Sequence, residues 1–226
     1  MDYIFGPSWF YGIDSIIDLV SILVSLLISY LSYRTYRYIS ERKYLHFAIA
    51  FFFVAVAFIS KILARLPVYS KELHVQTVGL VTVTTQVVEK VSWINQFSIS
   101  ISRFLMLLAF MLLVVVSLKI HDKKIITLLI YFLVISTTFV SQSYIIFHIT
   151  LLLLLATLFI NYRENYLKKR FKNAKLVMNT FLIILISEVF FLFGGFKPYI
   201  YVVGEIVQLL GYMLLLFAII KMLVKK

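Results

Sequence analysis

The residues of this sequence that could do chemistry are a few ionisable side chains set within long hydrophobic runs. They are carboxylates, fixed cations and a histidine, with a glutamine close to one of the carboxylates: Asp14, Asp18, Lys61, Arg65, Arg103, His148, Glu188, Glu205 and Gln208. A charge inside membrane hydrocarbon costs at least ~2.5 kcal/mol, so such groups normally face a bundle interior or water and are paired. We therefore expect ion pairing, or the binding of a proton or a small polar ligand.

The spacing of these residues suggests which of them meet. Asp14 and Asp18 are four residues apart, and so are Lys61 and Arg65, so each pair projects from one face of a helix. The acidic pair could then contact the basic pair across a bundle. Glu188 lies deepest, ~4 Å from the middle of its hydrophobic segment at 1.5 Å rise per residue. A carboxylate at that depth needs a partner, a water-filled cavity or a proton.

Each candidate also has a structural interpretation. For Asp14, Arg65 and Arg103 we favour ion pairs that fix helix registry, or side chains that extend toward the membrane surface. His148 stands alone on a leucine-rich segment, where a buried core histidine is the commoner case, and no second His lies close enough to suggest a metal site. Glu205, with Gln208 one turn further along, suits either a structural or a ligand-binding role.

Other chemistries find little support in the sequence. Cysteine is absent, which excludes disulfides and thiolate metal sites. Metalloprotease, serine-hydrolase and paired-aspartate phosphoryl-transfer motifs are absent too, so we expect a non-enzymatic protein without a cofactor. Were it an enzyme, Glu188 and His148 would be the acid–base candidates.

The elements that must position these residues are membrane-spanning helices. Hydrophobic residues make up 62% of the chain and charged residues 14%, a balance typical of a lipid-embedded protein. The sequence predicts one all-α domain, residues 1–226, a bundle of seven transmembrane helices in the lipid bilayer. The predicted spans are about 14–33, 44–64, 98–118, 125–142, 143–161, 176–194 and 199–221.

Basic residues predict the orientation of this bundle. Lys and Arg cluster after the first, third, fifth and seventh spans, and these sides are cytoplasmic by the positive-inside rule. We therefore expect a multi-pass protein of the cell membrane with its amino terminus outside and its carboxyl terminus in the cytoplasm. All the ionisable residues named above would then lie in the outer leaflet. Because the basic residues sit between spans, the net charge of +12 does not indicate nucleic-acid binding.

Segment 66–97 does not fit this scheme directly. Its part 74–88 is rich in β-branched residues, with Gly79 near its middle, which favours a β-hairpin or cap on the outer side of the bundle. An eighth, marginal span is the alternative, although it would disturb the alternation of charge.

Two further patterns concern helix packing. Ser21, Ser25, Ser29 and Ser32 continue the face of Asp14 and predict either a polar track or, as we favour, a close helix contact that Gly204 and Gly211 could share. Similar Tyr-Arg segments follow spans one and five, a hint of two three-span repeats joined by span four.

The predicted topology is similar to that of rhodopsins and seven-helix receptors, but only in topology. The mid-helix lysine that holds retinal is missing from the last span, where Lys221 lies at the cytoplasmic end, and the receptor motifs are missing as well.

We expect a sensor, a receptor-like protein or an accessory module whose outer-leaflet pocket responds to a small polar ligand or proton. The alternative is a small proton-coupled transporter, or a membrane subunit of a translocation complex. The basic segment 162–175 is the candidate contact for a membrane or cytoplasmic protein partner.

Overall fold

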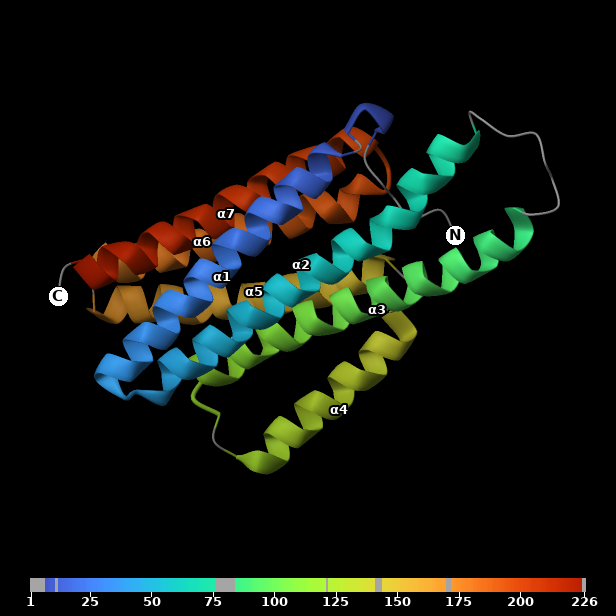
Figure 1. The fold of residues 1–226 in the computed structure, drawn as a ribbon. Coiled ribbons are helices and arrows are strands. Elements are labelled where there is room, and N and C mark those ends of the chain that lie inside the picture. The colour runs from blue at the N-terminus through green and yellow to red at the C-terminus, as the bar shows by residue number, and fades with distance from the viewer. Residues whose placement is uncertain are drawn as a thin grey trace.

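The regular structure of this chain is helical throughout the part that can be described. The structure is a computed structural model, and it describes residues 7–10, 12–75, 84–120, 122–140, 144–169 and 172–224. These residues contain a short 3-10 helix, η1, Ser8–Phe10, and seven α-helices and no strand (Figure 1). The α-helices are α1 Ile13–Ile39, α2 Arg42–Val75, α3 Thr84–Ser117, α4 Lys123–Val140, α5 Tyr144–Lys169, α6 Lys172–Gly194 and α7 Pro198–Val224. The expected all-α fold is confirmed.

Turn residues explain where several of these helices begin and end. Ser40 adopts the left-handed conformation after α1 (φ 59°), and its N–H bonds the carbonyl of Tyr36, which closes the last turn. The side chain of Asp122 accepts a hydrogen bond from the Lys124 N–H at 2.9 Å and so caps the start of α4. Pro198 opens α7, where its fixed φ suits the first helical position.

Six helices in the described part of the chain are long and apolar enough to cross a membrane: 13–39, 42–65, 95–117, 144–168, 174–194 and 198–223. Each reaches or exceeds the ~20 residues that a ~30 Å hydrocarbon core requires. The chain is therefore a multi-pass helical membrane protein by the length and composition of its helices. The described part of the span predicted at 125–142 lies in α4, which is not among the six.

The long helices, as far as they are described, pack in a closed ring. Consecutive contacts run from α1 to α2, α3, α5, α6 and α7, and α7 returns to α1. Helix α4 packs chiefly against α3 and lies outside this ring (Figure 1). We call the two ends of the bundle the α6–α7 end, which holds the turn between those helices, and the α1–α2 end, which holds the turn after Ile39.

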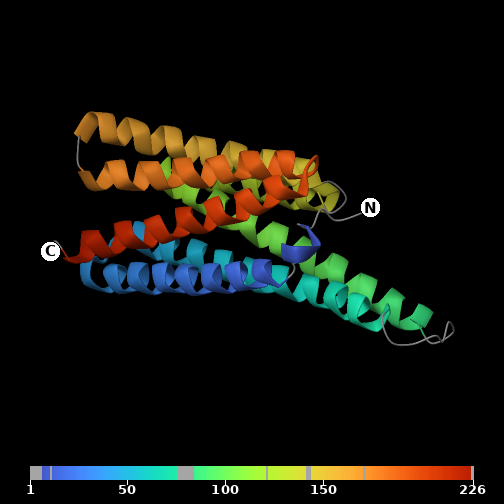
Figure 2. The ribbon, with the colours of Figure 1, turned by 90° about the horizontal axis from the view of Figure 1, so that it is seen from above.

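The expected β-hairpin in 66–97 is wrong for the residues that can be described. Residues 66–75 continue α2 and residues 84–97 begin α3, while 76–83 lie outside the described residues. The two helices run side by side beyond the start of α1 (Figure 2). The described ends of 74–88 thus belong to α2 and α3 rather than to a separate eighth span. Strand propensity of β-branched residues is weak and depends on context, and here two long helical patterns flank the segment.

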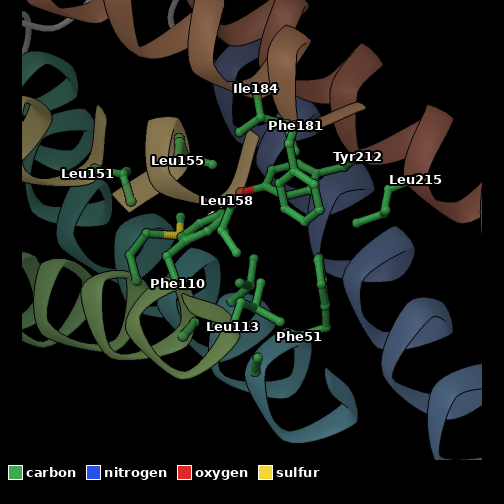
Figure 3. Close-up of a cluster of buried hydrophobic side chains, with 14 of the residues drawn as sticks. Phe51, Phe110, Leu113, Leu151, Leu155, Leu158, Phe181, Ile184, Tyr212 and Leu215 are labelled. Carbon is green, nitrogen blue, oxygen red and sulfur yellow. Dashed lines mark hydrogen bonds between the residues drawn. The ribbon is translucent and has the colours of Figure 1, made fainter. Parts of the chain in front are cut away.

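A dense apolar core lies among the helices of the ring (Figure 3). Large, fully buried side chains from all six ring helices take part in it, among them Ile28, Phe51, Phe110, Leu155, Leu158, Phe181, Ile184 and Tyr212. Phe58 meets Tyr212 edge to face with ring centroids 5.7 Å apart, and Tyr162 stacks on Phe181 at 5.1 Å. Aromatic pairs of this kind add specific geometry to the packing of the core.

The serine face of α1 and the glycines of α7 take part in different contacts. Ser29 donates a hydrogen bond to the carbonyl of Ala48 on α2 at 2.8 Å, so this face of α1 packs closely on a neighbouring helix. Gly204 and Gly211 face α6 instead, where an added Cβ would lie 3.0 Å from the ring of Phe191 and 2.5 Å from Cγ1 of Ile184. The expectation that these glycines share a seam with α1 is therefore wrong.

Candidate ligand-binding site

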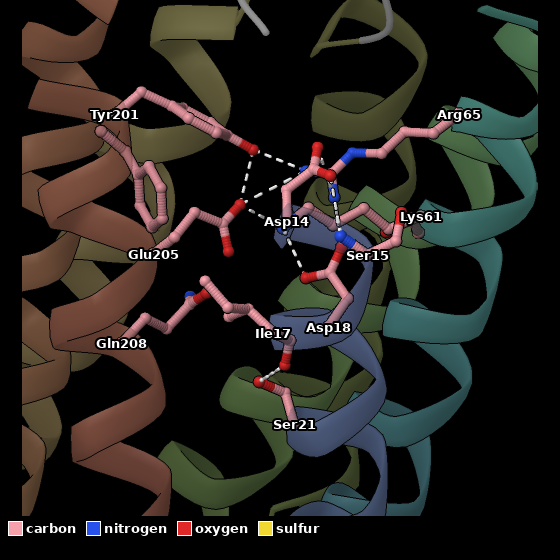
Figure 4. A network of polar contacts seen from close by, with 12 residues as sticks. Asp14, Ser15, Ile17, Asp18, Ser21, Lys61, Arg65, Tyr201, Glu205 and Gln208 are labelled. Carbon is pink, nitrogen blue, oxygen red and sulfur yellow. Dashed lines mark hydrogen bonds and ion pairs between the residues drawn. The ribbon is translucent and has the colours of Figure 1, made fainter. Parts of the chain in front are cut away.

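A network of ion pairs joins α1, α2 and α7 near the α6–α7 end of the bundle (Figure 4). Its centre is Arg65, whose side chain is only 3% exposed. Arg65 Nη1 lies 2.6 Å from Asp18 Oδ2 and 3.2 Å from Asp14 Oδ2. Arg65 Nη2 donates hydrogen bonds to the Tyr201 hydroxyl at 2.6 Å and to Glu205 Oε1 at 3.3 Å. The planar fork of the guanidinium thereby ties α1 to α7 through α2.

Lys61 lies one turn before Arg65 and contacts the same two helices. Its ammonium donates to Asp18 Oδ1 at 2.9 Å and to Glu205 Oε1 at 2.7 Å. The lysine side chain is 26% exposed, whereas those of Asp18 and Glu205 are exposed by no more than 1%. Both pairs that the spacing suggested, two acids on α1 and two bases on α2, thus meet across one helix interface.

Tyr201 is a member of this network that sequence reasoning missed. Tyrosines are common at membrane surfaces, but Tyr201 is buried, with 5% exposure. Its hydroxyl donates to Glu205 Oε1 at 2.5 Å and accepts from Arg65. The available signal was its position four residues before Glu205, which places both on one face of α7.

A second polar group joins α5, α6 and α7 in the same half of the ring. His148 Nδ1 lies 2.7 Å from Glu188 Oε2, and both side chains are buried. Gln208 Nε2 donates to the other oxygen, Glu188 Oε1, at 3.3 Å. An ionised carboxylate only accepts hydrogen bonds, so His148 carries its hydrogen on Nδ1 whenever Glu188 is ionised. The deep glutamate therefore has two partners from two helices.

Aromatic rings surround the histidine of this second group. The ring of Tyr144 lies 4.3 Å from that of His148, Phe147 lies at 4.9 Å and Phe191 at 5.3 Å, measured between centroids. Tyr144 also donates a hydrogen bond from its hydroxyl to the carbonyl of Phe191 at 3.0 Å. These contacts fix the orientation of the imidazole against α6.

A cavity of about 130 Å³ lies between the two polar groups. Its wall includes Lys61 and Arg65 from the first group and His148, Glu188 and Gln208 from the second. Helices α2, α3, α5, α6 and α7 all contribute side chains to it, and Phe58, Met106, Phe147, Leu151 and Phe191 supply much of the apolar surface. Charged and apolar groups thus share one wall, an arrangement typical of small-molecule sites.

Arg103 and Asp14 complete the set of residues that the sequence singled out. Arg103 of α3 lines the cavity, with its guanidinium carbon 5.6 Å from the centre of the Phe147 ring. Asp14 lies at the edge of the first network, where its Oδ1 accepts the N–H of Ser15 at 2.8 Å in the first turn of α1. The structure therefore places all nine residues at one end of the bundle, and six of them line the cavity: Lys61, Arg65, Arg103, His148, Glu188 and Gln208. Glu205 does not line the cavity but bonds to Lys61, which does.

Groups of His, Asp and Glu that could hold a metal ion do not occur among the described residues. The serine face of α1 does not line the cavity. Ser21 instead donates to the carbonyl of Ile17, one turn earlier in its own helix, at 2.9 Å. The polar residues of α1 thus support the ion-pair network and the helix contact, while the cavity is built on the other helices of the ring.

The chain was also compared with known proteins. No model of a protein family, no curated protein and no solved structure matches it.

Proposed function

We propose that this protein is a non-enzymatic membrane sensor whose cavity binds a small polar ligand or a proton and thereby shifts the packing of its helices. The observation that carries the proposal is the composition of the cavity wall. Lys61 and Arg65, which tie α1 to α7, line the same cavity as His148 and Glu188, which tie α5 to α6. A ligand that competes for these contacts acts on both halves of the ring at once.

The side of the membrane that the cavity faces is part of this proposal. Exposed basic residues gather toward the α1–α2 end: Arg34, Arg37, Arg42, Lys43, Lys123, Lys124, Arg163, Lys168, Lys175 and Lys221. From the positive-inside rule we propose that this end is cytoplasmic and that the cavity lies in the outer half of the membrane. The segment 162–175 remains our proposed contact for a protein partner, since it carries exposed cations at that end.

A transporter is the second candidate, and one observation favours it. Helices α1 to α3 and α5 to α7 form two halves of the ring with α4 outside, the arrangement expected of two three-helix repeats joined by a linker. The apolar core weighs against it, because Phe51, Phe110 and Tyr212 follow the cavity toward the α1–α2 end and are fully buried. We therefore prefer the sensor, in which no solute needs to cross that layer.

Distance measurements between spin labels would test the sensor proposal. Because the chain lacks cysteine, the double variant Tyr38→Cys, Leu167→Cys carries labels only on exposed positions of α1 and α5 at the α1–α2 end. On acidification from about pH 7.5 to about pH 5.5, we expect the label distance to shift by about 1–2 Å.

The variant Glu188→Gln serves as the matched control for this experiment. It retains the shape of the side chain but removes its charge, so the shift should be lost. An unchanged distance across this pH range and across a library of small ligands would contradict the sensor. Movement of a solute into proteoliposomes that depends on Glu188 would instead favour the transporter.

A further inference from the structure

The cations of the ion-pair network lie between its carboxylates and the cavity. Lys61 and Arg65 line the cavity, whereas their partners Asp18 and Glu205 do not. Arg103 brings a further guanidinium to the wall from α3. Within the part of the chain that can be described, Glu188 is the one carboxylate on the wall, and it is engaged by His148 and Gln208. A ligand in the cavity is therefore surrounded mainly by positively charged side chains.

Hydrogen-bond donors also remain for such a ligand. An ammonium has three N–H donors, and the described contacts of Lys61 use two of them, toward Asp18 and Glu205. His148 uses Nδ1 toward Glu188, and its Nε2 has no hydrogen-bond partner among the described residues. His148 lines the cavity, and when the imidazole is protonated its Nε2 becomes a hydrogen-bond donor. An anionic oxygen would satisfy both groups.

The rest of the wall is apolar, which limits the kind of anion that fits. Phe58, Met106, Phe147 and Leu151 line the cavity beside the cations. A fully hydrated inorganic anion would leave these side chains without contacts, whereas a carboxylate with a short hydrocarbon tail would cover them. An apolar cavity of about 150 Å³ in another protein admits benzene, so a volume of about 130 Å³ suits about six non-hydrogen atoms.

The charge balance of the site points to a proton that binds with the anion. The ionisable groups described here include four carboxylates, Asp14, Asp18, Glu188 and Glu205, and three fixed cations, Lys61, Arg65 and Arg103. With all seven of these groups charged and His148 neutral, the described site would carry one negative charge in excess. An added anion would raise this excess to two negative charges, and a proton on His148 would offset the added charge.

The surroundings of His148 make it the acceptor of this proton. Glu188 of α6 accepts from its Nδ1, Tyr144 of its own helix packs on its ring, and Arg103 of α3 lies on the same wall. From the remaining helices, the titratable and charged groups on that wall are Lys61 and Arg65 of α2 and Tyr201 of α7. Glu188, the negative partner of the imidazole, is in direct contact with it. A bound anion would screen the imidazole from the cations on the wall.

From these observations we infer that the cavity binds a short-chain monocarboxylate, of the size of butyrate, as the anion together with one proton on His148. The inference rests on the proposed function, since it names the ligand class of the sensor's cavity. The carboxylate bonds to Lys61 and to Nε2 of the protonated His148, and the hydrocarbon tail lies against Phe58 and Phe147. No covalent bond changes, and the proton comes from solution.

Calorimetric titration of the purified full chain in lipid nanodiscs tests this inference. Butyrate, butyramide and butylammonium share a four-carbon skeleton, differ in size by at most one non-hydrogen atom, and differ in charge. We expect butyrate to bind at least about tenfold more tightly than either of the others, because hydrogen bonds to a charged group are the stronger ones. Proton uptake should appear as a heat that changes with the ionisation enthalpy of the buffer.

Variants locate the binding site within the same experiment. His148→Gln should bind butyrate without proton uptake and with at least about tenfold lower affinity near pH 6. The matched control is Lys221→Gln, an exposed cation at the opposite end, which should leave both quantities unchanged. A series of carboxylates from acetate to octanoate can be titrated into the wild-type chain, so this measurement does not depend on the folding of a variant. Binding should be tightest near butyrate.

The outcomes separate this inference from the proposed function. Equal binding of butyramide, a preference for butylammonium, or no binding of any carboxylate in the series would overturn the inference, while a pH-dependent label distance would still uphold the sensor. Butyrate binding with an unchanged label distance would support the inference and contradict the sensor.

Discussion

At the scale of single residues, burial decides how much each charge matters to stability. The side chains of Arg65, Asp18 and Glu205 are exposed by 3% or less. Desolvation offsets much of the attraction in a buried pair, so such a pair adds little net stability over well-packed apolar residues. Removing one partner is different, because it leaves an uncompensated charge inside the protein. The ion-pair network should therefore be sensitive to single substitutions.

The substitution Arg65→Met should lower the free energy of unfolding by about 3–5 kcal/mol, because it strands the carboxylates that Arg65 holds. Equilibrium unfolding in mixed detergent micelles measures this loss. In the Arg65→Met background, Asp18→Asn should recover part of it by neutralising one stranded carboxylate. The control Arg163→Met changes an exposed residue and should stay within about 0.5 kcal/mol of the wild type. Equal stabilities of the two single variants would contradict the assigned role of Arg65.

At the scale of helices, close approach depends on small residues at particular positions. Gly211 allows α7 to lie against α6, since an added Cβ would lie 2.5 Å from Cγ1 and 3.4 Å from the backbone nitrogen of Ile184. Helix association in lipid relies on such packing because lipid tails are as apolar as the side chains. The position of α7 in turn fixes Glu205 and Gln208 at the site.

We expect Gly211→Ala to destabilise the protein by about 1–3 kcal/mol through overpacking against Ile184. Thermal unfolding in detergent, followed by loss of helical circular dichroism, measures the effect. The variant Ile184→Ala removes the crowded atom and provides the matched background. There the added cost of Gly211→Ala should be smaller, and a cost equal to that in the wild type would show that the contact does not limit packing.

At the scale of the whole molecule, the proposed orientation rests on the difference in charge between the two ends of the bundle. The sensor requires the cavity to face outward and the basic α1–α2 end to face the cytoplasm. Lys197, in the turn before α7, and Glu164, near the end of α5, are both exposed and lie at opposite ends. They offer a direct measurement of which end is which.

Single-cysteine variants in this cysteine-free chain should distinguish the two ends in intact cells. We expect a membrane-impermeant maleimide to label Lys197→Cys from outside and to label Glu164→Cys only after permeabilisation. The reverse pattern would place the cavity on the cytoplasmic side and refute the orientation, though not the cavity itself. Labelling of both variants in intact cells would indicate that the chain inserts in two orientations.

The sequence alone determined that the chain forms apolar helices and roughly where they lie. Six of the predicted spans correspond to helices long enough to cross a membrane, and the turn before Pro198 falls where expected. This was predictable because the free energy of transferring a segment into lipid sums over its own residues. The β-hairpin predicted in segment 66–97 was wrong for its described residues, because strand propensity depends on packing partners that the sequence does not name.

Only the tertiary structure decided which side chains meet. Lys61 and Glu205 are 144 residues apart in the chain, and Tyr201 joins them although its sequence pattern also suits the membrane surface. Gly211 faces α6 rather than α1, and the cavity lies among five helices that no local pattern brings together. These features depend on how each helix is rotated and which helices become its neighbours. In a membrane that choice follows from side-chain packing across the whole ring, so it cannot be read from any one segment.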